Sequence, residues 1–165
     1  MQLPKRKPAK FSELPEDGFM TGHKFNEISQ HLEHLKKIQF PAAAEVSRLA
    51  ELGDFSENVE YQLAKGRLRA INHKILLLEH QLQHAVIIAP QHQKSTVQIG
   101  TTVTLESQGK QKKYQILGST ESNPQKGIIS YQSPLGSALM GKKTGDSVIL
   151  SAGGKQTEYT ILNIE

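Results

Sequence analysis

Four carboxylates gather between residues 49 and 64, a stretch without lysine or arginine in a chain whose net charge is +4. They are Glu51, Asp54, Glu57 and Glu60. Clustered carboxylates can hold a hard cation through their oxygens, or they can cap a helix. The spacing Asp54-x-x-Glu57 is that of a capping box, in which the first acid accepts a bond from the third helical N–H and the second reaches back. Taken alone, these residues favour the cap, and the two roles are compatible.

Two amphipathic segments flank the acidic stretch. Their apolar residues recur at alternating spacings of three and four, which is typical of one stripe along a helix. With so short a connection between them, the two stripes are buried most simply against each other, as an antiparallel coiled-coil hairpin of about 45 Å. The upstream stripe is Phe25, Ile28, Leu32, Leu35, Gln39, Ala42, Val46 and Leu49, with Gln39 as a polar interruption, and the downstream stripe is Leu68, Ile71, Ile75, Leu78, Leu82 and Ala85.

The pattern divides the chain into parts. Residues 1–19 carry four basic residues among prolines and are predicted to form a flexible basic tail, for which a solvated terminus is the simplest interpretation. Residues 20–88 form the predicted hairpin, and residues 89–96 are a polar linker in which Pro90 stops the second helix. From residue 97 the apolar period changes to two, which indicates a second domain, 97–165.

The second domain is predicted to be a small α+β domain on an antiparallel sheet. Strands are expected at 97–99, 101–105, 113–117, 127–131, 147–151 and 157–164. Ser133 followed by Pro134 predicts a helix N-terminus, because serine caps helices and proline fits the first helical position. Leu135, Leu139 and Met140 supply the apolar face of this helix, and Gly141 ends it.

Composition limits the other possibilities. The 165 residues include no cysteine, which excludes disulfides and thiolate zinc sites and fits a reducing cytoplasm. No apolar run approaches the roughly 18 residues of a membrane span, and the N-terminus does not resemble a signal peptide. We therefore expect a cytoplasmic protein without membrane contact. The positive charge permits contact with a polyanion, although many basic proteins bind no nucleic acid.

Two motifs resemble those of the bacterial Gre transcript-cleavage factors, the GreA and GreB type. The first is GDFSENVEY at residues 53–61, followed by Ala64-Lys65, and it resembles the tip sequence of that family. The second is ISYQSPLGSALMGK at residues 129–142, which is similar to the family's C-terminal signature. Both occur in the family's order and spacing, and the resemblance runs from about Met20 to Glu165.

The resemblance implies a fold and a partner. The fold is an N-terminal coiled coil that enters the secondary channel of RNA polymerase, followed by a domain of FK506-binding-protein-like topology that docks at the channel rim. Such a factor is not an enzyme by itself and binds polymerase as a monomer. It stimulates the polymerase's own cleavage of the nascent RNA 3′ end in backtracked complexes. The docking residues implied are Ser133, Pro134 and Leu135.

The resemblance also implies residue roles at the tip. Asp54 and Glu57 would hold a second Mg²⁺ near the polymerase's own ion and position a water, with no cofactor bound stably by the free protein. Four neighbours would support the tip: Ser56, Asn58, Glu60 and Tyr61. For Glu60, contact with the metal and contact with a basic neighbour on the polymerase are both open. Arg67, Arg69 and Lys74 are candidates for contact with the extruded RNA, against the alternative of a solvated helix face.

Some features depart from the family pattern. Family members usually have an acidic residue after the Ala-Lys pair, where this chain has Gly66-Arg67, and a glycine inside a helix costs roughly 1 kcal/mol against alanine. The spacing from Pro41 to Gly53 is about one residue short, and one residue turns a helix by about 100°. Pro41 can absorb the difference as a kink.

Four histidines are predicted to lie near each other at the base of the hairpin, and their default interpretation is surface residues without metal. They are His31, His34, His80 and His84. Two functions other than transcript cleavage are compatible with parts of the sequence. A channel-binding regulator that inhibits or competes is disfavoured by the intact Asp54 and Glu57, whereas Gly66 and the N-terminal tail are compatible with it. A peptidyl-prolyl isomerase is disfavoured because only three aromatic residues, all tyrosines, follow the hairpin.

Overall fold

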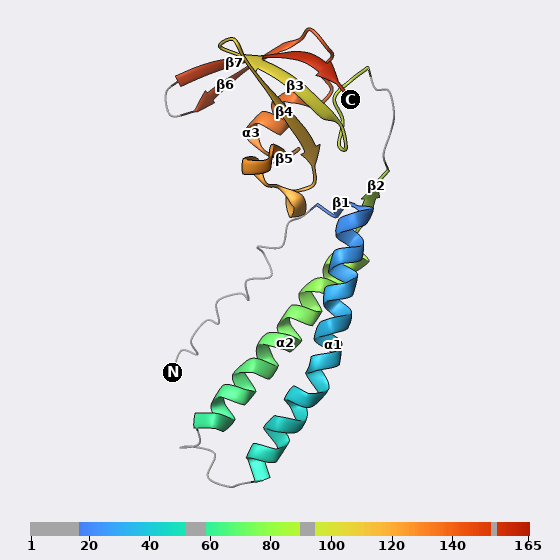
Figure 1. Ribbon diagram of the computed structural model, residues 1–165, viewed down its shortest axis with the longest axis vertical. Coiled ribbons are helices and arrows are strands. Elements are labelled where there is room, and N and C mark those ends of the chain that lie inside the picture. Colours follow the sequence, from blue (N-terminus) through green and yellow to red (C-terminus); the bar gives the residue numbers. More distant parts are fainter. Residues whose placement is uncertain (1–16, 52–58, 90–94, 153–154) are drawn as a thin grey trace, which may run out of the picture. The chain divides into compact units, whose positions relative to one another are not determined.

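The computed structural model describes residues 17–51, 59–89, 95–152 and 155–165. These residues form two compact units (Figure 1). The helical unit comprises residues 20–89. The C-terminal unit comprises residues 95–165 together with residues 17–19, which the sequence pattern had assigned to the basic tail.

The helical unit is an antiparallel pair of helices, α1 (Gly22–Glu51) and α2 (Val59–Gln83), which lie side by side in Figure 1. Two contacts between the helices show that α1 and α2 run in opposite directions. Lys36 Nζ lies 2.7 Å from Glu79 Oε1, and Gln39 Nε2 donates to Asn72 Oδ1 at 2.8 Å. As the residue number rises along α1, the number of its partner falls along α2, which confirms the predicted hairpin.

The two predicted stripes form the core of this unit. Its buried members on α1 and α2 are Ile28, Leu35, Ile75 and Leu78, with other stripe residues packed around them. Burial of each such side chain contributes roughly 1.5–3 kcal/mol, so the stripes supply most of the force that pairs the helices. The polar interruption at Gln39 is matched across the pair, because its amide is bonded to Asn72. Helix α1 continues through Pro41.

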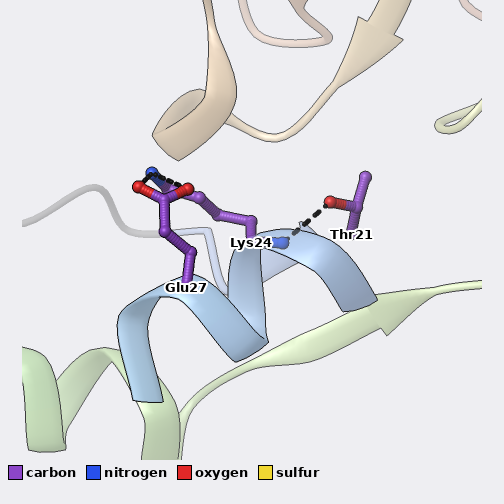
Figure 2. Close-up of polar contacts among 3 residues, drawn as sticks. All are labelled: Thr21, Lys24 and Glu27. Carbon is purple, nitrogen blue, oxygen red and sulfur yellow. Dashed lines mark hydrogen bonds and ion pairs between the residues drawn. The ribbon is translucent and has the colours of Figure 1, made fainter. Parts of the chain in front are cut away.

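The start of α1 is capped by a side chain, as Figure 2 shows. Thr21 Oγ1 accepts a hydrogen bond from the backbone N–H of Lys24 at 3.2 Å, which satisfies one of the N–H groups that have no partner within the helix. One turn further on, Lys24 Nζ lies 3.1 Å from Glu27 Oε1. The short strands β1 (Phe19–Thr21) and β2 (Val86–Ile88) pair beside this helix start, and Met20 is buried in the helical core.

The C-terminal unit is built on a five-stranded sheet with the order β5-β4-β3-β7-β6. Its strands are β3 (Thr102–Ser107), β4 (Lys110–Leu117), β5 (Ile128–Ser130), β6 (Ser147–Ala152) and β7 (Lys155–Ile164). The predicted antiparallel sheet is a mixed one, because β4 and β5 run parallel, with Gln115 opposite Ile128. Residues 97–99, predicted as a strand, are irregular.

The parallel pair has a simple cause. The chain does not turn back directly after β4 but passes through two short 3-10 helices, η2 (Ser119–Glu121) and η3 (Pro124–Lys126), before β5. A parallel neighbour needs such a crossover, since a tight turn can only produce an antiparallel one. The unit is an α+β domain with a mixed sheet, so the predicted fold class holds.

Helix α3 (Pro134–Leu139) packs against the core of this sheet. The completely buried side chains include Val103, Leu105, Ile161 and Leu139. Helix and sheet approach closely at Gly136, where a Cβ atom would lie 2.1 Å from the carbonyl oxygen of Ser130. Only glycine fits there, which fixes how α3 sits against β5.

Residues 17–19 are fastened to the C-terminal unit through Asp17, which is only 7% exposed. Its carboxylate accepts hydrogen bonds from the backbone N–H of Ser119, at 3.2 Å, and from the Ser119 hydroxyl. The Phe19 ring meets the Tyr131 ring edge to face, with 5.7 Å between centroids. A Cβ atom on Gly118 would lie 1.8 Å from the Phe19 carbonyl oxygen, so glycine is required for this approach.

Replacing Asp17 by alanine is expected to lower the free energy of unfolding of the C-terminal unit by roughly 1–3 kcal/mol, because the buried N–H of Ser119 loses its acceptor. Urea unfolding followed by near-ultraviolet circular dichroism measures this, since three of the four tyrosines lie in this unit. The matched control is Glu158→Ala, which removes an exposed carboxylate from the same unit. Equal stability of the two variants would contradict a structural role for Asp17.

Candidate functional site

The predicted tip lies where the two helices of the hairpin are joined. Helix α1 ends at Glu51 and α2 begins at Val59, and residues 52–58 connect these two ends. Four of the predicted site residues, Asp54, Ser56, Glu57 and Asn58, lie outside the described residues. The geometry of the site therefore rests on the helical residues on either side.

Next to the tip, the helix ends carry buried apolar side chains and a group of charged side chains. Leu49 on α1 and Ala64 on α2 are buried, with 2% and 8% of their surface exposed. Arg48 Nη2 lies 2.8 Å from Glu45 Oε1. That hydrogen bond, with the attraction between the two charges, lowers the pKa of the Glu45 carboxyl. The same bond and charge, and in addition the charge of Glu60 on α2, raise the pKa of Arg48.

Glu60 interacts electrostatically with its own helix and with Arg48 on α1. Its side chain is exposed at the start of α2, and its negative charge is favourable there because it faces the positive end of the helix dipole. The charge of Glu60 also acts on a basic neighbour within the same hairpin, because it contributes to the raised pKa of Arg48. Glu60 thus has an electrostatic role within this chain.

Tyr61 is placed by a contact that the sequence analysis did not identify. Lys65 Nζ lies over the Tyr61 ring, 5.3 Å from its centroid, which is a cation–π contact. The two residues are four positions apart on α2, so they share one helix face. The i, i+4 spacing of an aromatic and a cation was the signal that could have revealed it.

The three predicted RNA-contacting residues are all exposed on α2, but they do not share one face. Arg67 and Lys74 are seven positions apart and lie within about 20° of each other around the helix axis. Arg69 is two positions from Arg67 and lies about 160° away from it. A single strand of RNA along one side of α2 could therefore meet Arg67 and Lys74, but not Arg69 as well.

The predicted docking residues lie at the start of α3. The Ser133 hydroxyl accepts a bond from the N–H of Gly136 at 3.0 Å and donates to the carbonyl of Ser130 at 2.6 Å, so it acts as the predicted cap. Leu135 is half-buried against the domain core. Pro134 is exposed, and of the three side chains it is the most accessible to a partner.

The four histidines are exposed, as predicted. The rings of His80 and His84 lie 4.2 Å apart, and His84 Nδ1 lies 2.9 Å from the carbonyl oxygen of His80, to which it donates when protonated. Across residues 17–51, 59–89, 95–152 and 155–165, no three histidine, aspartate or glutamate side chains are grouped to hold a metal ion. Within the same residues, no helix is long and apolar enough to cross a membrane.

The two units together define a class of protein: a two-helix hairpin with an acidic connection, followed by a small α+β domain. Family models match both parts. Residues 19–87 match the N-terminal domain of transcription elongation factors, and residues 92–165 match the C-terminal domain of the GreA/GreB transcription elongation factors. The chain belongs to the GreA/GreB family of transcription elongation factors, as the resemblance of its two motifs indicated.

Two GreA proteins with at least 40% identity agree with this assignment. The chain is 42% identical over 139 residues to the transcription elongation factor GreA of Macrococcus caseolyticus, covering 82% of this chain and 88% of that protein. It is 40% identical over 146 residues to GreA of Nautilia profundicola, covering 86% and 90%. Among solved structures, the GreA factor homolog Gfh1 of Thermus thermophilus aligns with a TM-score of 0.39 at 26% identity, covering 86% and 94%.

Replacing Gly66 by alanine is expected to stabilise the helical unit by roughly 0.5–1 kcal/mol, because alanine loses less backbone entropy in a helix than glycine. Gly66 is exposed inside α2, and a Cβ atom there would meet no other atom within 4 Å. Thermal unfolding followed by far-ultraviolet circular dichroism at the helix signal measures the change. The contrasting control is Gly118→Ala, which is expected to destabilise because its Cβ would overlap the Phe19 carbonyl. A loss of stability on Gly66→Ala would contradict the geometry of α2.

Proposed function

We propose that this protein binds RNA polymerase, inserts its helical hairpin into the secondary channel, and stimulates the polymerase's cleavage of the nascent RNA 3′ end in backtracked complexes. The observation that carries the proposal is the placement of the acidic segment. In a chain of the GreA/GreB family, residues 52–58 join the two ends of an antiparallel helix pair. A long, narrow element that ends in carboxylates is suited to deliver them into a channel.

Asp54 and Glu57 are the proposed catalytic residues. Their carboxylate oxygens are the ligand type that Mg²⁺ prefers, and Mg²⁺ commonly binds only one or two protein carboxylates while keeping several waters. A second Mg²⁺, shared with the polymerase, would supply charge stabilisation to the attacking and leaving oxygens of the phosphodiester. The two carboxylates would bind that ion and accept hydrogen bonds from the attacking water, which orients it. The protein acts as an accessory factor, since the polymerase supplies the rest of the active centre.

The described residues around the tip support this function by positioning. Leu49 on α1 and Ala64 on α2 are both buried next to the tip. Glu60 and Tyr61 belong to the first turn of α2, where Glu60 favours a charged Arg48 on α1 and Tyr61 packs with Lys65. Ser56 and Asn58 complete the proposed tip. In the C-terminal unit, Pro134 and Leu135 at the start of α3 are the proposed polymerase-docking residues, with Ser133 as the cap that shapes them.

The test compares Asp54→Ala and Glu57→Ala with the wild-type protein in backtracked elongation complexes, by measuring the rate at which short RNA 3′ fragments are released. Each variant is expected to lose at least about tenfold of the stimulated rate, because a metal-binding oxygen is removed. Polymerase affinity, measured by competition with labelled wild-type protein, is expected to stay unchanged, since docking depends on other residues.

The matched control is Glu51→Ala, which removes an exposed carboxylate from the last residue of α1. It is expected to retain stimulation, because the proposal assigns Glu51 no metal. If wild-type protein binds polymerase and leaves cleavage unchanged or slower, the protein is a channel-occupying regulator and Asp54 and Glu57 are helix-capping residues.

The placement of basic residues on α2 gives a second test of the proposal that the hairpin enters the secondary channel. The double variant Arg67→Ala/Lys74→Ala is expected to weaken binding to backtracked complexes and to reduce the salt dependence of binding, because each phosphate contact adds to that dependence. Arg69→Ala should change neither, since Arg69 lies on another side of α2. Complexes without extruded RNA provide the reference. Equal effects of the double variant on complexes with and without extruded RNA would contradict the RNA contact.

A further inference from the structure

The C-terminal unit contains a cavity of about 200 Å³ that the proposed function does not use. Leu105 forms part of its lining, and two tyrosines, two lysines and a threonine line it as well: Tyr114, Tyr159, Lys110, Lys112 and Thr157. Leu105 is buried in the domain core, and both tyrosines are half-buried against that core. Both lysines are exposed at the rim. The cavity thus has an apolar base, aromatic side chains and a positively charged rim.

The strand register explains why these side chains meet. In the antiparallel sheet, Leu105 lies opposite Lys112 on β4 and opposite Ile161 on β7, and directly opposed residues point to the same face. Side chains two positions apart along a strand share that face as well, which adds Lys110, Tyr114 and Tyr159. This is the face on which the core lies and against which α3 packs. The cavity is the part of this face next to the β3–β4 turn.

The cavity is distinct from the proposed docking residues. Strand β4 runs from Lys110 at the cavity to Leu117 at its other end, where the Leu117 carbonyl accepts a bond from Tyr131 at 3.0 Å. The eight residues of β4 span about 23 Å between those ends. Ser133 and Pro134 lie two and three residues after Tyr131, so the start of α3 and the cavity lie toward opposite ends of the same strand.

The two faces of this sheet carry different charged side chains. No carboxylate belongs to the described lining of the cavity. The neighbouring carboxylates Glu106 and Glu158 alternate to the other face, where they line a second, shallow hollow. Within the described strands, the charged residues on the cavity face are all lysines, whereas the opposite face carries Glu106 and Glu158 and one lysine, Lys113, which is paired with Glu165. A ligand with both a planar apolar part and a negative charge matches the cavity face in shape and charge.

We infer that this cavity binds single-stranded nucleic acid, with one base against Tyr114 and Tyr159 and the adjacent phosphates at Lys110 and Lys112. Stacking of bases on aromatic side chains, combined with lysines along the backbone, is the usual way in which proteins bind single strands without sequence preference. A cavity of this size is smaller than the roughly 300–1,000 Å³ of sites for drug-sized ligands, so it admits one base and no folded element. The inference concerns the C-terminal unit and does not depend on transcript cleavage.

The test is a titration of the full-length, ¹⁵N-labelled protein with a single-stranded oligothymidylate of about ten nucleotides, within the range that single-strand-binding domains cover. NMR locates the contact, because the chain has other basic residues on its helices and N-terminus. The amide signals of residues 105–114 and 157–159 are expected to shift. Lys110→Ala/Lys112→Ala should lower the affinity and reduce the salt slope by about two, one for each phosphate contact.

Two further variants separate stacking from charge. Tyr159→Leu is expected to weaken binding about tenfold because it removes a stacking surface, while Tyr159→Phe, which keeps the ring, should retain the affinity. The matched charge control is Lys142→Ala/Lys143→Ala, which removes two exposed lysines from the same unit outside the cavity. The spectrum of each variant shows whether it is folded.

Three results would overturn the inference. The first is the absence of shifts at the cavity amides. The second is an equal loss of affinity at those amides in the Lys142/Lys143 control, which would indicate general charge attraction. The third is equal or tighter binding of a polyglutamate peptide at the same amides, which would assign the cavity to acidic peptides.

Discussion

Burial of the facing apolar stripes of α1 and α2 is the constraint on which the helical unit depends. Neither stripe can be buried within its own helix, and the antiparallel pairing covers both at once. That pairing brings Glu51 and Val59, the two helix ends, to the same end of the unit. The acidic connection therefore joins a rigid pair of helices. In the proposed function, this pairing would present the carboxylates with more precision than a loop between separate helices, because the geometry of such a loop would vary.

In the C-terminal unit, a polar contact joins segments that are far apart in the sequence, as the apolar stripes join the two helices in the helical unit. The Asp17 carboxylate, buried beside Ser119, fastens the residues that precede the hairpin to a domain that follows it in sequence. Two glycines, Gly118 and Gly136, allow the close backbone approaches that this unit requires. The chain thus passes between the two units twice, once after Phe19 and once after α2. The segment 17–19 before the hairpin is therefore part of the C-terminal unit.

The features that the sequence could predict are local or periodic. The two stripes, the Ser133 cap and most strands follow from spacing and residue type, and the structure contains them. The Asp17–Ser119 contact joins residues 102 positions apart, and no local sequence pattern predicts such a pair. The parallel pairing of β4 with β5 was missed for a similar reason, since strand direction depends on the crossover between them. At the tip, the family motif indicated roles for Asp54 and Glu57. The separation of Arg69 from Arg67 could also have been predicted, because helix geometry applied to the predicted second helix gives it directly.

The central claim is that the carboxylates of the tip help to hold an Mg²⁺ ion that RNA cleavage requires. The most direct measurement is the rate of RNA cleavage in backtracked complexes as a function of Mg²⁺ concentration, with and without saturating protein. The account predicts that the protein lowers the Mg²⁺ concentration needed for half-maximal cleavage, because two additional ligands strengthen binding of the second ion. An unchanged Mg²⁺ dependence, with or without a change in maximal rate, would contradict it.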